Sequence, residues 1–307
     1  MMDLDEIERD LMREVSGVIG IPEGAYNFRV NGKSIRRHSS EKIDISPKRD
    51  KSGIDIYVAD GAKDEIAHIP VIISASGLKE AVYNDFYIGD DCEVTIIAGC
   101  GIYNCGASDS VHDGIHMFHV GKNSTVYYIE KHCGIGPGAG KILNPTTKLF
   151  MGENSRAELL LEQIKGVDST KRLTEAELAK CAQVVIKERL FTHGKQSADS
   201  KIVARLNGDG SSVDIMSRSV AQDYSKQNFC SNIIGAAKCR GHSECDAIIM
   251  DKAQVSAEPS LDAQSVDAEL IHEAAIGKIA GEQLIKLMTL GLSRRQAESQ
   301  IINGFLK

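Results

Sequence analysis

Three residues near the C-terminal end of the chain have side chains suited to metal chemistry. Cys245 lies in "GHSECDAIIMD", and the pair His272 and Glu273 lies in "DAELIHEA". A thiolate beside an imidazole or a carboxylate is a reasonable iron ligand set. Cys245 is separated from this pair by close to 30 residues, which is also roughly the length of a sequence repeat described below. One turn of a repeating fold would therefore place Cys245 and the pair on adjacent strands about 5 Å apart. Only one of His272 and Glu273 can share the face of Cys245, because successive strand residues point to opposite faces.

A second candidate is the histidine triplet His112, His116 and His119 in "SVHDGIHMFHV". Spacings of four and three place imidazoles on one face only in a helix, and in a strand His116 and His119 point to opposite faces. The stretch has the character of strand and turn. We therefore favour a hydrogen-bonded structural set over a metal site, and the metal site stays open as an alternative.

The remaining motifs are weaker. Cys92, Cys100 and Cys105 cluster, but the chain has no C-x-x-C pair, so we interpret them as partly buried thiols.

The run "HCGIGPGAGKI" lacks the first glycine and the Ser or Thr of a phosphate-binding loop, because Ile135 and Ile142 stand there. The strand-like "KILNPTTKLF" that follows is not the helix of a dinucleotide fold. We interpret these glycines as a turn.

The strands and turns that would position these residues recur along the sequence as a repeated unit. Turn-like hexapeptides, each followed by an apolar alternating segment, recur at Gly89, Gly121, Gly152, Ala179, Gly208 and Met250. Such a period indicates a solenoid whose coils pack only on their neighbours, and we expect the glycine to supply a positive φ. Strands without intervening helices favour a parallel β-helix over an α/β fold, with an antiparallel sandwich as the alternative. We interpret "TEAELAKCAQVVIKERL" as strand because the turn pattern keeps its phase there.

The two ends are predicted to be helical. Leu4, Ile7, Leu11 and Val15 form one stripe of a helix over residues 3–15. At the other end two helices are predicted near 280–290 and 293–303, with Ser293 as an N-cap. We therefore expect an N-terminal region of helix plus strands (1–75), a β-helix core (76–279) and a C-terminal helical segment (280–307).

Composition narrows the function classes. A net charge of −7 argues against broad nucleic-acid binding, since phosphate neutralisation needs a basic face. No apolar run approaches the ~20 residues that span a bilayer, and the acidic start is unlike a signal peptide. With eight cysteines and no secretory signal, we expect thiols in a cytoplasmic protein. The lack of tryptophan and the 28 glycines suit a layered β structure.

Four segments resemble the SufB/SufD family of iron–sulfur cluster assembly scaffolds, in order and over most of the chain from about residue 84. They are "NDFYIGDDCEVTIIAGCGIYN", "GIHMFHVGKNSTVYYIEKHCG", "GHSECDAIIMD" and "IHEAAIGKIAGEQLIKLMTLGLSRRQAESQIINGFL". The resemblance implies a right-handed parallel β-helix core. It also implies that residues 280–307 dock a SufC-like ABC ATPase, so that the chain is a scaffold and the ATPase activity belongs to its partner.

The resemblance further implies that Cys245 and Glu273, with His272 beside it, hold a nascent iron–sulfur cluster at the interface of two β-helix subunits. The second subunit would be another copy or a SufB/SufD-type paralogue, and a sulfur donor and apo-protein recipients would be further partners. A family cysteine linked to sulfur entry aligns with His132, and Cys133 comes one residue later, on the other face of a strand. A relay through Cys133 is therefore not favoured.

Two other functions are weighed. A SufD-like subunit would shape the same complex without ligating the cluster. A β-helix enzyme acting on polysaccharide would use aromatic platforms, and the absence of tryptophan counts against it. The reduced N-terminal region resembles the single scaffold of a minimal two-component system. Residues 1–75 receive no functional interpretation.

Overall fold

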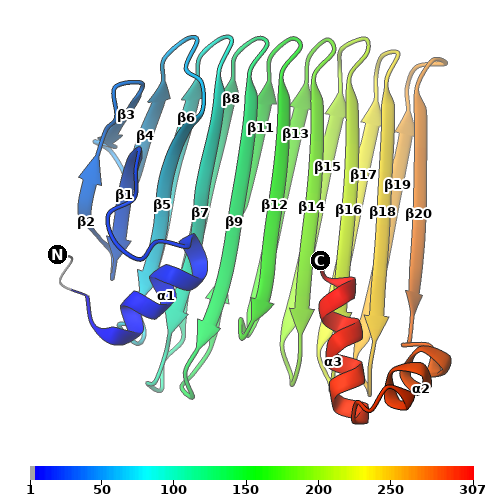
Figure 1. Ribbon diagram of the computed structural model, residues 1–307. Helices are drawn as coiled ribbons and strands as arrows, with labels where there is room; N and C mark the ends of the chain where they lie inside the picture. The colour runs from blue at the N-terminus through cyan, green and yellow to red at the C-terminus, as the bar shows by residue number, and fades with distance from the viewer. Residues whose placement is uncertain (1–3) are drawn as a thin grey trace.

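The computed structural model describes residues 4–307 as a flattened parallel β-solenoid of about eight turns. Two sheets face each other along its length, and each coil contributes one strand to each sheet (Figure 1). Within residues 4–307 the only antiparallel pairs are β1 with β2 and β3 with β4, all at the N-terminal end. The predicted parallel β-helix is confirmed, and the antiparallel sandwich is excluded.

Sheet A contains, in spatial order, β2 (Lys33–His38), β1 (Ala25–Val30), β5 (Glu65–Ile73), β7 (Glu93–Tyr103), β9 (Thr125–Ile135), β12 (Arg156–Lys165), β14 (Gln183–Thr192), β16 (Ser212–Ala221), β18 (Arg240–Ile249) and β20 (Glu269–Gly277). Sheet B contains β19 (Gln254–Ala263), β17 (Lys226–Gly235), β15 (Ser197–Leu206), β13 (Ser169–Leu178), β10 (Lys141–Leu143) with β11 (Thr146–Met151), β8 (Ser110–Val120), β6 (Lys79–Ile88), β4 (Gly53–Val58) and β3 (Ile43–Pro47). The segment 174–190, predicted as strand rather than helix, lies in β13 and β14 and the turn between them.

Strict alternation of buried and half-exposed side chains defines the interior. In β8 every second residue from Ser110 to Val120 is buried between the sheets. Aromatic and aliphatic side chains fill the middle of the solenoid, where the rings of Phe86 and Phe118 stack with centroids 4.1 Å apart. Each fully buried side chain of this size contributes about 1.5–3 kcal/mol. The coil spacing therefore fixes which residues share an interior position.

The turn glycines act by close approach and not by a positive φ. A Cβ on Gly121 would lie 2.5 Å from the carbonyl oxygen of Gly89 on the previous coil. The left-handed residue comes two positions later, and Asn123 has φ 56°. The expectation that these glycines supply the positive φ is thus wrong. Met250 does not belong to this set of turns. It follows a strand of sheet A, whereas the other five predicted turn positions follow strands of sheet B.

The N-terminal helix α1 (Glu6–Ser16) lies across β5, β7 and β9 on the outer face of sheet A (Figure 1). Asp5 caps it and forms a capping box with Glu8. Leu11, from the predicted apolar stripe, packs over Gly101, where a Cβ would lie 3.0 Å from the Leu11 side chain. Cys133 belongs to the same apolar cluster beneath the helix.

Helices α2 (Gly281–Thr289) and α3 (Arg294–Phe305) follow β20 (Figure 1). Ser293 caps α3 with Gln296 as its capping-box partner, as predicted. α3 lies along the outer face of sheet A, where the Arg189 guanidinium donates to the Lys307 carbonyl oxygen. α2 buries no residue. The C-terminal helices are therefore much less tightly packed than α1.

The solenoid has one covered end and one open end. At the N-terminal end the antiparallel strands β2 and β3 form the sheet edges. At the other end the edges are β19 and β20, and no further strand of the described chain pairs with them. Inward-facing apolar side chains are uncovered there, such as Leu261 (39% exposed) and Ile276 (41% exposed). No helix among residues 4–307 is long and apolar enough to cross a membrane.

Candidate functional site

Cys245 and His272 lie on neighbouring strands at the open end and face the same side. Cys245 of β18 is in register with Ala274 of β20, and Ser243 is in register with His272. Cys245 and Ser243 are both buried in the interior, so their partners on β20 also face inward. The one-turn relationship predicted from the spacing is therefore present, and His272 is the member of the pair that shares the face of Cys245.

Burial governs the chemistry of Cys245. Its side chain is 1% exposed and belongs to the main core cluster. Desolvation first, and then the carboxylates of Glu188 and Asp246, raise the pKa of the Cys245 thiol to about 12. The group is a neutral thiol at physiological pH. It becomes a thiolate ligand only when a bound cation replaces the proton.

His272 presents an unpartnered nitrogen to the interior. Its Nδ1 is buried and has no hydrogen-bond partner. An unsatisfied buried polar atom costs about 1–3 kcal/mol, so it is unusual in a packed strand. Imidazole nitrogen and thiol sulfur are both donors for iron. These two side chains fit an iron or iron–sulfur unit bound at the open end.

Glu273 points to the outer face, opposite to Cys245. Its register partner there is Glu244. Burial raises the pKa of Glu244, and a hydrogen bond and the charge of Asp246 raise it further. The carboxylates of Glu244, Asp246 and Glu273 thus lie along the outside of the same edge. Among residues 4–307, no three His, Cys, Asp or Glu side chains converge closely enough to hold a metal ion unaided.

The histidine triplet divides between the faces as expected for a strand. His112 and His116 are buried in the interior, and His119 stacks on the outer face between Tyr87 and Phe150. Nδ1 of His116 lies 2.7 Å from the Tyr128 hydroxyl, and Nδ1 of His112 lies 3.1 Å from Glu80. The structural interpretation fits these contacts.

A row of buried charges runs inside the solenoid and was not found from the sequence. Arg172 donates to the carboxylate of Glu130, and its Nε lies 3.7 Å from Glu188. The hydroxyls of Ser200 and Ser217 donate to Glu188 at 2.6 and 3.0 Å. Ser217 is the register partner of Cys245. The one available signal was a polar residue at an inward position of an apolar strand, such as the glutamate in "YYIEKH".

These buried charges, together with burial itself, shift the pKa values of several interior side chains. Burial alone would raise the pKa of Glu130, but Arg172 outweighs it and holds that pKa well below its usual range. Desolvation lowers the pKa of His116 to about 4 and that of His132 to about 3. Both imidazoles are therefore neutral at pH 7. Arg172 is the cation that balances the two buried carboxylates.

The other sequence candidates lie away from the open end. His132 is interior and Cys133 lies on the outer face under α1, so the one-residue shift does reverse the side chain. Cys92 and Cys100 are buried and Cys105 is exposed. The glycines Gly136 to Gly140 form the turn between β9 and β10.

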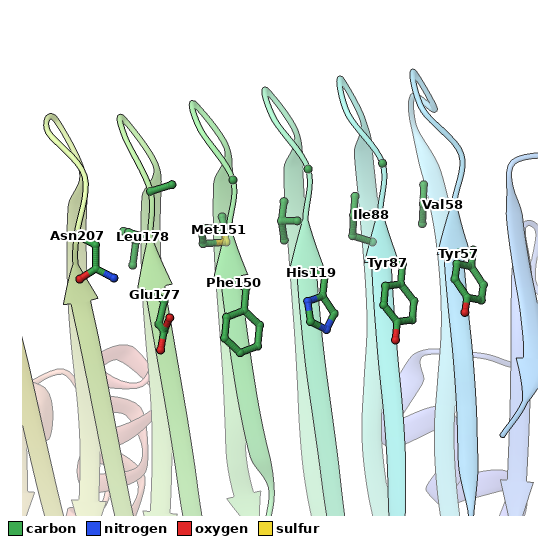
Figure 2. A pocket seen from close by; sticks show the side chains of 15 residues that line it. Tyr57, Val58, Tyr87, Ile88, His119, Phe150, Met151, Glu177, Leu178 and Asn207 are labelled. Carbon is green, nitrogen blue, oxygen red and sulfur yellow. The ribbon is translucent and has the colours of Figure 1, made fainter. Parts of the chain in front are cut away.

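A groove of about 690 Å³ crosses the outer side of sheet B, far along the solenoid from Cys245 (Figure 2). Stacked rings of Tyr57, Tyr87, His119 and Phe150 line it, with neighbouring centroids 4.8 to 5.2 Å apart. Glu177 continues the row beyond Phe150 (Figure 2). The groove contains neither Cys245 nor His272 and is no part of the candidate site.

Comparison with known proteins places this chain in a family. Residues 78–305 match the family described as "SUF system FeS cluster assembly, SufBD core domain". The chain belongs to the SufB/SufD family. Curated relatives named "Iron-sulfur cluster assembly SufBD family protein" include one from Archaeoglobus fulgidus, 30% identical over 90% of this chain and 73% of the relative. One from Pyrococcus horikoshii is 28% identical over 89% of this chain and 84% of the relative.

A third SufB/SufD relative, from Methanothermobacter thermautotrophicus, is 26% identical over 77% of this chain and 57% of the relative. This chain therefore aligns with just over half of that protein. Iron–sulfur cluster assembly, the prediction drawn from the four segments, is confirmed at the level of the family. The matched family contains both SufB and SufD, so the choice between these two roles has to be argued from the site residues.

Proposed function

We propose that this chain is a SufB-like scaffold on which an iron–sulfur cluster is assembled before transfer. The observation that carries the proposal is the pairing of the buried Cys245 thiol with the unpartnered Nδ1 of His272 on one interior face. A buried donor without a partner is costly, and an iron ion would satisfy it. Cys245 and His272 hold the nascent unit from the inside of the open edge.

Glu273 acts from the outside of the same edge. Beside Glu244 and Asp246 it supplies hard oxygen donors, which bind iron ions before they meet sulfide. Cluster assembly then has an outer position where iron is collected and an inner position where thiolate and imidazole retain the product. A sulfur donor supplies sulfide, and apo-proteins receive the cluster, in the cytoplasm.

The open end supports a two-subunit arrangement. Uncovered interior residues such as Leu261 and Ile276 continue the core cluster into solvent. An exposed sheet edge of this kind is an assembly surface unless it is covered. A second subunit placed there encloses Cys245 and His272 and can complete their ligand set.

The C-terminal segment 280–307 docks a SufC-like ABC ATPase. Ile285 and Leu290 of this segment are 63% and 75% exposed, an unusual state for large apolar side chains on a short helix. A groove of about 940 Å³ lies between α3 and sheet A and adds to the surface that a partner could contact. ATP-driven movement of the partner would reach the open edge through β20, which leads directly into α2.

Anaerobic reconstitution with iron and sulfide, with and without the ATPase, tests the proposal. The expected result is a visible band near ~400 nm with bound iron and sulfide, lost in Cys245→Ser. Cys230→Ser is the matched control, because Cys230 faces outward on sheet B in β17. Stoichiometric iron and sulfide retained by Cys245→Ser would overturn the assignment.

The alternative is a SufD-like subunit that shapes the complex without ligating the cluster. It is favoured by the high pKa of Cys245 and because, within residues 4–307, no three His, Cys, Asp or Glu side chains lie close enough to hold a metal ion. Absence of any cluster in the unmodified protein, with ATPase binding intact, would select this alternative.

A further inference from the structure

The N-terminal end of the solenoid carries a positive charge that the chain as a whole does not. Residues 33–51 contain seven lysines and arginines and three carboxylates, a net charge of +4 in a protein whose net charge is −7. This stretch forms β2, β3 and the turn that leads into β4, at the end of the solenoid remote from Cys245 (Figure 1). A local reversal of charge attracts anionic partners to that end of the molecule.

Most of these cations have no carboxylate partner. Lys48 is the exception, because it pairs with Asp55 and Asp85. Arg36 lies over the ring of Tyr26 at 6.0 Å, which leaves its charge uncompensated. Within residues 4–307 the cations of this stretch that form no ion pair are Lys33, Arg36, Arg37, Lys42, Arg49 and Lys51.

Two of the charged segments lie side by side. Arg29 of β1 donates to the Ser52 hydroxyl at 2.7 Å, and the register partner of Arg29 on β2 is Ser34. The turn that contains the exposed Arg49 and Lys51 therefore lies next to the start of β2. The positive surface is thus centred on β2 and continues onto this turn.

The free edge of β2 is open, whereas that of β3 is covered. β2 pairs only with β1, and β3 only with β4, among the described strands. In β3 the N–H groups of Ile43 and Ile45 on the free side donate to the hydroxyls of Ser40 and Ser39 at 3.1 and 2.9 Å. Within the described chain, no backbone group outside β1 bonds to the backbone of β2.

The backbone of Arg37 faces this open edge. Asn31 at the end of β1 donates its N–H to Ile72 after β1 has paired with β5, and successive N–H groups alternate sides along a strand. Even-numbered residues of β1 therefore face β2. Phe28 is one of them and is the register partner of Arg36, so Arg36 bonds to β1 and Arg37 directs its N–H and C=O outward.

We propose that β2 binds an acidic, extended segment of a partner protein, which adds to sheet A as a further strand. Backbone hydrogen bonds along the edge supply affinity in this mode, and side-chain pairs supply selectivity. Carboxylates of the added strand lie opposite Lys33, Arg36 and Arg37, and opposite charges across neighbouring strands stabilise the pair.

The charges and the edge together select this occupant. A second copy of β2 is excluded, because it would bring like charges into opposition, which is how edge strands avoid self-association. A nucleic acid would meet the cations but has no backbone that continues a β-sheet. The surface is remote from Cys245, so the partner leaves the proposed cluster site free.

Two peptides of equal charge test strand addition. The probe is a ten-residue peptide of alternating Glu and Val, and the control alternates Glu and Pro, which lacks half of the N–H donors. In calorimetry at low salt we expect the Glu-Val peptide to bind about tenfold or more tightly, and added salt to weaken it. Equal binding of the two peptides, binding of neither, or equally tight binding of oligothymidylate overturns the proposal.

Charge variants test the location. Lys33→Gln combined with Arg36→Gln should weaken binding of the Glu-Val peptide by about tenfold. The control combines Lys122→Gln with Arg240→Gln, which removes the same charge at exposed surface pairs on other coils and should keep full affinity. Equal weakening in both double variants would reflect net charge alone and overturns the β2 site.

Amide hydrogen exchange on the unmodified protein tests the edge without any substitution. A saturating concentration of the Glu-Val peptide should slow exchange at Arg37 by about tenfold or more. Exchange at Arg36 should not change, because its N–H already bonds to β1. Unchanged exchange at Arg37 with the peptide bound overturns strand addition.

Discussion

Cys245 and His272 face one interior from adjacent coils, offset by a single inward position along their strands. The thiol is held neutral by burial, and the imidazole nitrogen has no partner. In the proposed function these two groups are ligands of one cation, and the chemistry of each leads to several predictions.

Metal binding at Cys245 should strengthen as pH rises. The thiol is protonated at neutral pH because its pKa is raised to about 12, so each metal–thiolate bond releases one proton. The apparent affinity for Co²⁺, followed by its thiolate charge-transfer absorption, should increase about tenfold per pH unit between pH 7 and 8. In Cys245→Ser the charge-transfer band should be absent. A pH-independent affinity would contradict a thiolate ligand.

The same shift has a signature in the metal-free protein. The pKa of a cysteine thiol is ordinarily 9.0, and burial raises the pKa of Cys245 to about 12, so the folded state binds more protons than the unfolded state between these two pH values. The stabilising contribution is complete below about pH 9 and is lost as pH rises toward the folded value. Urea unfolding at pH 8 and 10 should show a larger loss for the unmodified protein than for Cys245→Ser.

Arg172 is expected to be the most sensitive charge in the interior. It balances Glu130 and Glu188, so Arg172→Met leaves two buried carboxylates without their cation. The free energy of unfolding should fall by about 3–5 kcal/mol in urea titrations. Arg156→Met, at a half-exposed surface pair, is the control and should change it by about 1 kcal/mol or less. A loss of about 1 kcal/mol or less for Arg172→Met would show that Arg172 is not needed to balance Glu130 and Glu188.

Gly121→Ala should destabilise the solenoid turn by about 1–3 kcal/mol. The new Cβ would meet the Gly89 carbonyl oxygen on the neighbouring coil, which belongs to a rigid backbone. Gly281→Ala, at the start of α2, meets no atom within 4 Å and is the matched control. Thermal unfolding followed by circular dichroism measures both variants. Equal melting temperatures would mean that the coils can separate locally at no cost.

Ile285→Glu and Leu290→Glu should abolish binding of the SufC-like ATPase while leaving the melting temperature unchanged. Both side chains are largely exposed, so their replacement removes no packing within the chain. Gln283→Glu adds the same charge elsewhere on α2 and should retain binding in isothermal titration calorimetry. Unimpaired binding by both apolar variants would place the docking surface elsewhere.

The sequence by itself determined the solenoid and the neighbouring coils of Cys245 and His272. A turn signal that recurs at nearly constant intervals fixes the register of each coil on the next, because a slip would expose the apolar face of every strand. The spacing alone also showed that His272 and Glu273 must face opposite sides. The helices at the two ends also followed from local signals, which were the apolar stripe of Leu4 and Leu11 at one end and the Ser293 cap at the other.

Only the tertiary structure decided which member of the pair faces Cys245 and how the interior charges meet. Arg172 reaches Glu130 across the two sheets, from residues 42 positions apart, and no local pattern encodes such a contact. The role of the turn glycines was decided in the same way, since it depends on a carbonyl oxygen of another coil. The alternation of side chains along a strand can be derived from that strand alone. Contacts between side chains of different strands depend on how the coils stack on one another. The packing of distant segments therefore determined the chemistry of the site.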